Sequence, residues 1–244
     1  MYKKSSETYG SIRIRRELMT LGHTCSRKRV SRLMRLSNLV AHLPKRYRNT
    51  TNSNHDQPIA SNVLNREFTA VAPNTKWTAD ITYIWTGEGW LYLSVVLDLF
   101  SRRVVGWAMQ NNLELSLVTS ALQMAVQGRQ PEPGLICHSD RGSQYASKDY
   151  QAALKARGMI CSMSRKGNCW DNAPTESFFA TLKKELVYKS KFETKEQARS
   201  RVFSWIEVWY NRQRLHSTLD YDNPEAFENK ALQTQTQKHL AIAP

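Results

Sequence analysis

The sequence predicts an α/β protein, with a mixed sheet flanked by helices and a small all-helical segment in front of it. Strand-like patterns fill residues 77–109, helical and strand patterns alternate from residue 113 to 188, and residues 8–39 carry only helical signals. With 41% hydrophobic residues, the chain of 244 residues has enough apolar material for a core, which excludes a disordered protein.

The first segment, residues 1–43, predicts two basic helices. The first spans Thr8–Leu21 and stops at Gly22, and Ser26 is a good N-cap for the second, Arg27–Asn38. One face of the second helix is apolar, and we expect its other faces to meet phosphates. Those faces carry Arg27, Lys28, Arg29, Arg32 and Arg35. A merely solvated charged face is an equally good explanation of the helix alone.

The charge of the chain is concentrated at its start. The whole sequence has 35 Lys and Arg against 21 Asp and Glu, a net charge of +14, and residues 1–50 hold 13 basic and two acidic residues. Such a basic segment indicates a polyanionic partner, most simply nucleic acid. A solubilising basic tail is the alternative.

The predicted core begins with three consecutive strands. Alternation over residues 77–86 predicts a strand with Asp80 on its polar face, and the apolar run 90–97 predicts a strand buried on both faces. Residues 102–109 follow after a short turn, so the three strands form an antiparallel meander.

The second half of the core alternates helix and strand. We expect helices at 113–127 and 147–157, strands at 135–138 and 159–163, and a further helix starting at 171–174. Asp140 comes directly after the first of these strands, and Glu176 lies in the first turn of the last helix. Three antiparallel strands followed by this alternation are the layout of an RNase H-like fold.

These patterns divide the chain into five parts. Residues 1–43 form the basic helical segment, 44–70 a linker, 71–190 the core, 191–230 a C-terminal helical extension and 231–244 a frayed tail. The extension opens on a capping box formed by residues 194–197.

Several classes of protein are excluded. The apolar run from Leu91 to Phe100 is far shorter than the roughly 20 residues of a membrane span, and no secretory signal opens the chain. The four cysteines stand far apart without a C-x-x-C pair, so we expect reduced thiols in a cytoplasmic protein, with a zinc site as a remote alternative.

Three carboxylates are the candidate catalytic residues. The inferred fold places the strands of Asp80 and Asp140 side by side and lets a helix bring Glu176 across to them. Two like charges about 4 Å apart repel by roughly 4 kcal/mol at an effective dielectric of 20, so such a cluster takes up protons or binds divalent cations. Oxygen ligands favour Mg²⁺ or Mn²⁺, and two such ions would serve phosphodiester chemistry.

Three strings around these carboxylates are distinctive. They are WTADITY at 77–83, HSDRGSQY at 138–145 and GNCWDNAPTESFF at 167–179, with 59 residues between the two aspartates and 35 between Asp140 and Glu176. They resemble the motifs of DDE transposases and retroviral-type integrases, in particular the orfB-type transposases of bacterial two-frame insertion sequences. Residues 9–39, 210–217 and 224–227 resemble the family's helical DNA-binding segment and its closing motif.

The resemblance implies an activity and its partners. It implies that Asp80, Asp140 and Glu176 hold two metal ions, Asp80 and Asp140 flanking both and Glu176 holding the second, while a DNA 3′-OH carries out strand transfer. The implied partners are double-stranded DNA from element ends and target, further copies of the chain, and an upstream-frame DNA-binding protein. The implied location is the bacterial cytoplasm, at the nucleoid when bound to DNA.

This sequence departs from the families it resembles in two respects. The orfB-type family usually has another helix before the Tyr-Gly motif at Tyr9, so we expect the helical segment to be incomplete. The histidine-cysteine zinc module of retroviral integrases is also missing, in agreement with the scattered cysteines. Two alternatives to a transposase therefore stay open. One is an RNase H-like nuclease that uses only water, and the other is a DNA-binding remnant or regulator of a truncated element.

Further residues are candidates for DNA contact. They are Lys183 and Lys184, seven and eight residues after Glu176 and so about two helical turns along; Arg141, Gln144 and Tyr145 after Asp140; Arg165, Lys166, Asn168 and Trp170 in a basic loop; and Arg214. Structural roles compete for each: turn formation after Asp140, anchoring for Trp170 and helix packing for Arg214. We expect His138 to be structural, Asp98 to end its strand, and Asp171 to belong to the loop and cap before the last core helix.

Overall fold

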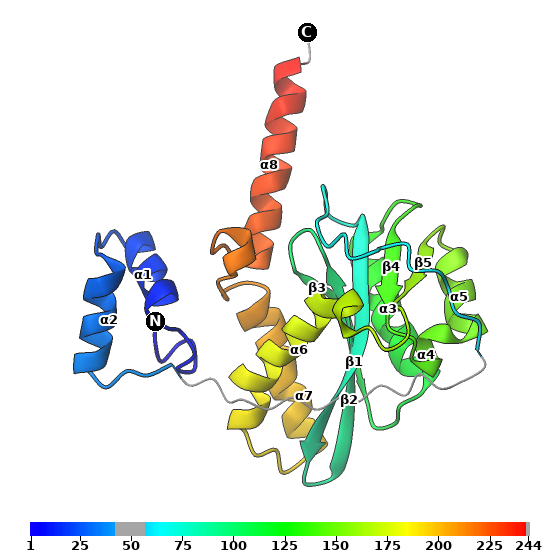
Figure 1. Ribbon diagram of the computed structural model, residues 1–244, viewed down its shortest axis with the longest axis horizontal. Coiled ribbons are helices and arrows are strands. Elements are labelled where there is room, and N and C mark those ends of the chain that lie inside the picture. The colour runs from blue at the N-terminus through cyan, green and yellow to red at the C-terminus, as the bar shows by residue number, and fades with distance from the viewer. Residues whose placement is uncertain (42–56, 243–244) are drawn as a thin grey trace.

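The computed structural model describes residues 1–41 and 57–242 and places a five-stranded sheet at the centre of the core (Figure 1). Its strands are β1 (Lys76–Thr86), β2 (Gly89–Asp98), β3 (Val104–Gln110), β4 (Ile136–Ser139) and β5 (Ile160–Met163). Their order is β3-β2-β1-β4-β5. β1 pairs antiparallel with β2 and parallel with β4, so the mixed sheet and the meander of the first three strands are confirmed.

Helices cover both faces of the sheet (Figure 1). On one face lie α3 (Leu115–Arg129), α4 (Ser143–Ala146) and α5 (Lys148–Lys155); on the other lie α6 (Ala173–Glu185) and α7 (Lys195–Ser204). Each face has its own apolar core, the first around Trp77 and Leu122 and the second around Leu93, Phe178 and Ile206. The sequence did not predict α4, a single turn in which the Gly142 carbonyl accepts from the Tyr145 and Ala146 amides.

The polar face of β1 is covered rather than open to solvent. Thr78, Thr82 and Thr86 are each at most 2% exposed, because α6 packs over this side of the strand. The Thr175 hydroxyl on α6 donates to Thr78 Oγ1 at 2.6 Å. A period of two separates the faces of a strand but does not tell which neighbour covers each face.

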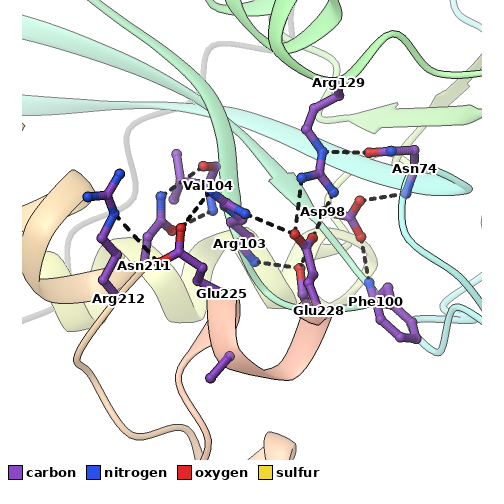
Figure 2. A network of polar contacts seen from close by, with 12 residues as sticks. Asn74, Asp98, Phe100, Arg103, Val104, Arg129, Asn211, Arg212, Glu225 and Glu228 are labelled. Carbon is purple, nitrogen blue, oxygen red and sulfur yellow. Dashed lines mark hydrogen bonds and ion pairs between the residues drawn. The ribbon is translucent and has the colours of Figure 1, made fainter. Parts of the chain in front are cut away.

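A polar network fixes the turn between β2 and β3 (Figure 2). Asp98 accepts from the Asn74 amide at 2.7 Å and from the Phe100 amide at 2.8 Å, so it ends its strand as predicted. Glu228, on α8 (Pro224–Ile242), accepts from Arg129 at 2.8 Å and lies in the same network. The C-terminal helix is thereby joined to the core by a carboxylate that is 2% exposed.

The C-terminal extension packs as part of the core. Thr194 caps α7 by accepting from the Gln197 amide, and α7 continues into an unpredicted π-helical stretch, η3 (Trp205–Tyr210). Asn211 then exchanges two hydrogen bonds of 3.0 Å with the backbone of Val104. The short 3-10 helices are η1 (Cys169–Asn172), η2 (Val187–Lys189) and η4 (Ser217–Leu219). α8 extends through the segment expected to be a tail, where residues of good helix propensity follow one another without Gly or Pro.

The N-terminal segment folds as two helices around a small core of its own. α1 (Ser11–Thr20) and α2 (Arg27–Leu36) enclose Tyr9, Val30 and other apolar side chains, and Ser26 caps α2 as predicted. The Tyr9 hydroxyl accepts from the Leu215 amide at 2.8 Å, which links this segment to the C-terminal extension.

The predicted linker contains both described and undescribed residues. Residues 42–56 lie outside the described part of the chain, whereas 57–70 form a loop on the core, as expected. Ser162 Oγ of β5 accepts from the amides of Val63 and Leu64, and Leu64 is only 1% exposed. Within the described ranges, the helices are all too short or too polar to cross a membrane.

Candidate active site

Three elements bring the candidate carboxylates together where β4 ends beside the middle of β1. β1 and β4 pair in parallel with Ala79 opposite Ser139, so the next residues, Asp80 and Asp140, lie at the same level of the sheet. Glu176 comes from the first turn of α6, which crosses β1 above them. All three carboxylates are half-buried, so each keeps one side open to solvent.

The electrostatics of the three carboxylates are coupled. Burial raises the pKa of Asp80 well above its usual range, and the charges of Asp140 and Glu176 raise it further. Burial and the charge of Asp140 likewise raise the pKa of Glu176. Backbone hydrogen bonding from Ile81 and the ammonium of Lys183 act in the opposite direction on Asp80. The site therefore holds more negative charge than its own surroundings neutralise.

Backbone amides orient the two aspartates, and a buried tyrosine lies within electrostatic range of them. The Gly142 amide donates to Asp140 Oδ1 at 2.9 Å, and a Cβ at position 142 would lie only 3.0 Å from that oxygen. The Ile81 amide donates to Asp80 Oδ1 at 2.7 Å. Behind them, Tyr145 is 1% exposed, and burial together with the charge of Asp80 raises the pKa of its phenol well above the usual value. Tyr145 is thus a neutral wall of the site.

The donor set suits a hard divalent cation. It consists of carboxylate oxygens from Asp80, Asp140 and Glu176, which repel one another, and such oxygens are the ligands that Mg²⁺ and Mn²⁺ prefer. In the described part of the chain, no three His, Cys, Asp or Glu side chains form a group close enough to surround one ion.

A second candidate surface lies on α2. Val30 and Met34 face the small N-terminal core and are 3% and 8% exposed. The five basic residues predicted for DNA contact are all exposed on the other faces of this helix: Arg27, Lys28, Arg29, Arg32 and Arg35. The helix therefore packs on one side and presents positive charge on the other, as the sequence predicts.

Known families match both parts of the molecule. Residues 70–169 and 157–224 match two families described as integrase core domain, and residues 1–47 match one described as HTH-like domain. Over 95% of its length the chain is 43% identical to "Transposase InsF for insertion sequence IS3A" of Escherichia coli (strain K12), of which it covers 80%. The chain belongs to the insertion-sequence transposases. The helical segment of this transposase is accordingly a DNA-binding domain of the helix-turn-helix type.

Further comparisons agree with the fold of the transposase. It is 44% identical over 93% of its length to "Insertion element IS600 uncharacterized 31 kDa protein" of Shigella sonnei and covers 84% of that protein. Among solved structures, the HTLV-2 integrase catalytic core domain in complex with magnesium, in its trimeric form, is 15% identical. It aligns with a TM-score of 0.50 over 65% of this chain and 99% of that one. The predicted integrase-type, RNase H-like core is confirmed.

Lys183 lies within electrostatic range of the carboxylates of the transposase. It stands seven residues after Glu176 on α6, hence on nearly the same helical face. Burial lowers the pKa of Lys183, and the charge of Asp80 works against that change. The adjacent Lys184 is half-buried.

The basic loop before α6 is held by a buried aspartate. Asp171 is fully buried and accepts from Arg165 at 2.8 Å and from Arg66 at 2.7 Å, which holds the pKa of Asp171 well below its usual range. Asp171 thus organises the loop, as predicted. Trp170 is 69% exposed at the end of this loop, and Lys166 is exposed beside it, with Asn168 capping the turn.

Other predicted DNA contacts lie against the protein itself. Arg214 is 6% exposed and forms an ion pair of 2.9 Å with Glu185. Gln144 donates to the Leu113 carbonyl at 3.3 Å, and Arg141 donates to the Ser164 carbonyl. His138 is fully buried between Ser162 and Ser164, so its structural role is confirmed.

Sequence reasoning missed the residues that dock α6 on the sheet. Thr175 bonds to Thr78, and Asn172 donates to the Ala79 carbonyl at 3.4 Å, directly beside Asp80. The position of Thr175 directly before Glu176 was visible in the sequence. Only the fold shows that the Thr175 hydroxyl faces Thr78. Arg13 and Arg102 were also missed, since they come together only in three dimensions.

Proposed function

We propose that Asp80, Asp140 and Glu176 are the catalytic residues with which the transposase cleaves element-end DNA and transfers its strands. The observation that carries this proposal is geometric: β1, the residue after β4 and the first turn of α6 bring three half-buried carboxylates together, and the charge of Asp140 raises the pKa values of the other two. Catalytic groups are characteristically found where burial and like charges shift pKa values together. The three residues also stand in the three motifs that resemble those of DDE transposases.

The same three carboxylates would hold divalent cations, Mg²⁺ or Mn²⁺, as two ions. Asp80 and Asp140 would flank both, and Glu176 would hold the second. Bound cations would supply Lewis-acid stabilisation of the phosphate charge and activate the attacking hydroxyl. The HTLV-2 integrase catalytic core domain, whose structure is in complex with magnesium, supports this assignment. The amides of Gly142 and Ile81 keep the aspartates oriented. The DNA 3′-OH is itself the nucleophile, so no covalent enzyme intermediate forms.

The remaining parts of the chain would hold the DNA and assemble the complex. The exposed basic faces of α2 would contact phosphates, and Lys183, Lys166 and Trp170 would contact DNA near the carboxylates. In this proposal the predicted segments have separate roles: residues 1–43 bind DNA, 44–70 are a linker, 71–190 form the catalytic core and 191–230 extend that core. Further copies of the chain and an upstream-frame DNA-binding protein would join it on two element ends, at the bacterial nucleoid in the cytoplasm.

The decisive experiment is a joining assay with Asp140→Asn. Labelled element-end DNA is incubated with the full chain and Mg²⁺ or Mn²⁺, and nicked and joined products are both scored. We expect Asp140→Asn to lower both products by more than about 100-fold, because several kcal/mol of transition-state stabilisation is lost. DNA binding should be unchanged.

Asp149→Asn is the matched control. It removes the same charge from an exposed residue in the first turn of α5, and its activity should equal that of the unaltered chain. Normal joining by Asp140→Asn would refute the assignment. Nicking without joining by the unaltered chain would instead indicate a nuclease.

A further inference from the structure

A cavity of about 320 Å³ lies where the N-terminal helices, the core and the C-terminal extension meet. Its walls come from α1, from the turn between β2 and β3, from α6 and from residues 210–218. A volume of this size falls at the lower end of the range for small-ligand sites. No residue of the proposed catalytic set lines it.

Three arginines, each from a different wall, line this cavity. Arg13, Arg102 and Arg214 all line it, and the positive charges of all three act on His216 on the same wall. Together with burial, these charges hold the pKa of His216 well below its usual value. The histidine is therefore uncharged at neutral pH, and it can take part in hydrogen bonds without adding repulsion.

Two of the three guanidinium groups form no ion pair among the described residues. Arg214 is neutralised by buried Glu185. Arg13 donates to the Leu215 carbonyl at 3.1 Å, and Arg102 donates to the Phe68 carbonyl at 3.2 Å, but neither forms an ion pair in the described part of the chain. Both side chains are half-buried. Burial of unpaired charge is costly, so an anion in this cavity would stabilise the arrangement.

The backbone conformation of Arg102 also supports an anion site in this cavity. This residue has φ of +60°, in the left-handed region that residues with a Cβ rarely adopt. The strain costs about 1 kcal/mol and is maintained by the turn that Asp98 fixes. This position of the turn is thus occupied by an arginine that lines the cavity, although a glycine would adopt the same φ without strain.

The other lining groups fit a phosphate. Ser177 and Thr181 lie one turn apart on α6, and Ser217 and Thr218 lie opposite on the C-terminal turn. Guanidinium groups bind phosphate oxygens in pairs, and the hydroxyls can donate to the oxygens that remain. Ser177 follows Glu176 directly, so a ligand here lies about 100° around α6 from the catalytic carboxylate.

We propose that this cavity binds a phosphate group, held by Arg13 and Arg102, and that a backbone phosphate of the bound DNA supplies it. The proposal rests on the proposed function for its DNA source, but the phosphate site itself does not depend on catalysis. One DNA strand would then be gripped by the N-terminal domain, the core and the C-terminal extension at once, in a fixed position relative to Glu176.

The test uses element-end duplexes that each carry one uncharged methylphosphonate, bound to the full chain without divalent cations. We expect one position at which neutralisation weakens binding about tenfold, the equivalent of one charged hydrogen bond. In Arg102→Gln and in Arg13→Gln, that position should lose its effect while other positions keep theirs. Arg212→Gln is the control, since Arg212 is exposed, does not line the cavity and carries the same charge; its pattern should be unchanged.

A second arm measures Tm against inorganic phosphate at constant ionic strength. Inorganic phosphate could raise the Tm of the unaltered chain but not that of Arg102→Gln, while no position in the DNA depends on Arg102. That result would support the site but assign it to a free phosphate. The proposal is overturned if neither arm depends on Arg102 or Arg13 in variants whose circular dichroism matches that of the unaltered chain. Asp140→Asn should keep both phosphate effects, which separates this outcome from a failure of the catalytic assignment.

Discussion

At the scale of single residues, the charged carboxylates of the active site lower the stability of the folded, metal-free protein. The raised pKa of Asp80 means that its ionised form is disfavoured in the folded protein. Its contribution to stability is therefore most favourable at low pH and declines as the pH rises from about 3.9 through the folded pKa. At neutral pH and without metal, the charge on Asp80 opposes folding.

Asp80→Asn should consequently stabilise the metal-free chain at pH 7. A gain on the order of 1 kcal/mol corresponds to about 2–4 °C in Tm for a protein of this size. The variant should also lose the rise in Tm that Mg²⁺ produces in the unaltered chain. Scanning calorimetry with and without Mg²⁺ measures both effects, and Asp149→Asn should change neither. A lower Tm for metal-free Asp80→Asn would contradict the charge-repulsion explanation.

His138 produces a pH dependence in the other direction. Burial lowers its pKa from 6.5 to about 4, so the unfolded chain takes up the proton first as the pH falls. Stability from this residue is complete above pH 6.5 and is lost progressively toward pH 4. The loss attributable to His138 should be about 2 kcal/mol by pH 5.

Urea unfolding of the unaltered chain and of His138→Gln at pH 7 and pH 5 tests this expectation. The difference in unfolding free energy between the two proteins should shrink by that amount at the lower pH, since the glutamine does not titrate. A difference that stays constant between the two pH values would show that His138 is not the responsible group.

At the scale of elements, the geometry of the site depends on how α6 sits on β1. The hydroxyls of Thr175 and Thr78 are both fully buried and bond to each other at 2.6 Å. Thr175→Val would leave the Thr78 hydroxyl with one partner fewer, at a cost of about 1–3 kcal/mol. The double variant Thr78→Val/Thr175→Val should cost less than the sum of the two single variants, because both polar groups are then gone.

Chemical unfolding of the four proteins gives the coupling energy, and the joining assay reports whether Glu176 has moved. Thr119→Val on α3 is the control, because its hydroxyl bonds only within its own helix. Additive losses in the double variant would mean that the two hydroxyls are not energetically linked.

The same pair of elements illustrates what the sequence could and could not predict. The order of elements and the positions of Asp80, Asp140 and Glu176 follow from periodicity and flanking motifs. The covering of the polar face of β1 could not be predicted, because an alternation of Thr with apolar residues is also typical of a strand with one face in water. Helix packing was a predicted alternative for Arg214, but its partner could not be predicted, since Glu185 lies 29 residues away in the sequence and is recognised only in the fold.

At the scale of the whole molecule, the C-terminal extension is inseparable from the catalytic core. Phe192, Val202, Ile206 and Tyr210 belong to the same apolar cluster as strands β1 to β3 and helix α6. Burying one such side chain contributes about 1.5–3 kcal/mol, so together these four approach the whole net stability of a typical domain.

A chain that stops at residue 190 should therefore fail to fold cooperatively, although it contains all three carboxylates. We expect it to retain part of its far-UV circular dichroism, to lose its near-UV signal and to bind a hydrophobic dye. A chain ending at residue 234 serves as the control and should unfold in a single transition. Cooperative unfolding of the shorter chain would show that residues 71–190 are an independent domain.

The attachment of α8 near its N-terminal end has a mechanical consequence for the rest of the helix. Glu225 and Glu228 fix the first turn of this 19-residue helix to Arg103 and Arg129, and the rest of the helix projects away from the core (Figure 1). At 1.5 Å per residue the helix is about 28 Å long, so a tilt of 10° at its base displaces its far end by roughly 5 Å. Arg103 lies directly before β3, and Arg129 is the last residue of α3. A small movement beside the sheet would therefore become a larger displacement at the far end of α8.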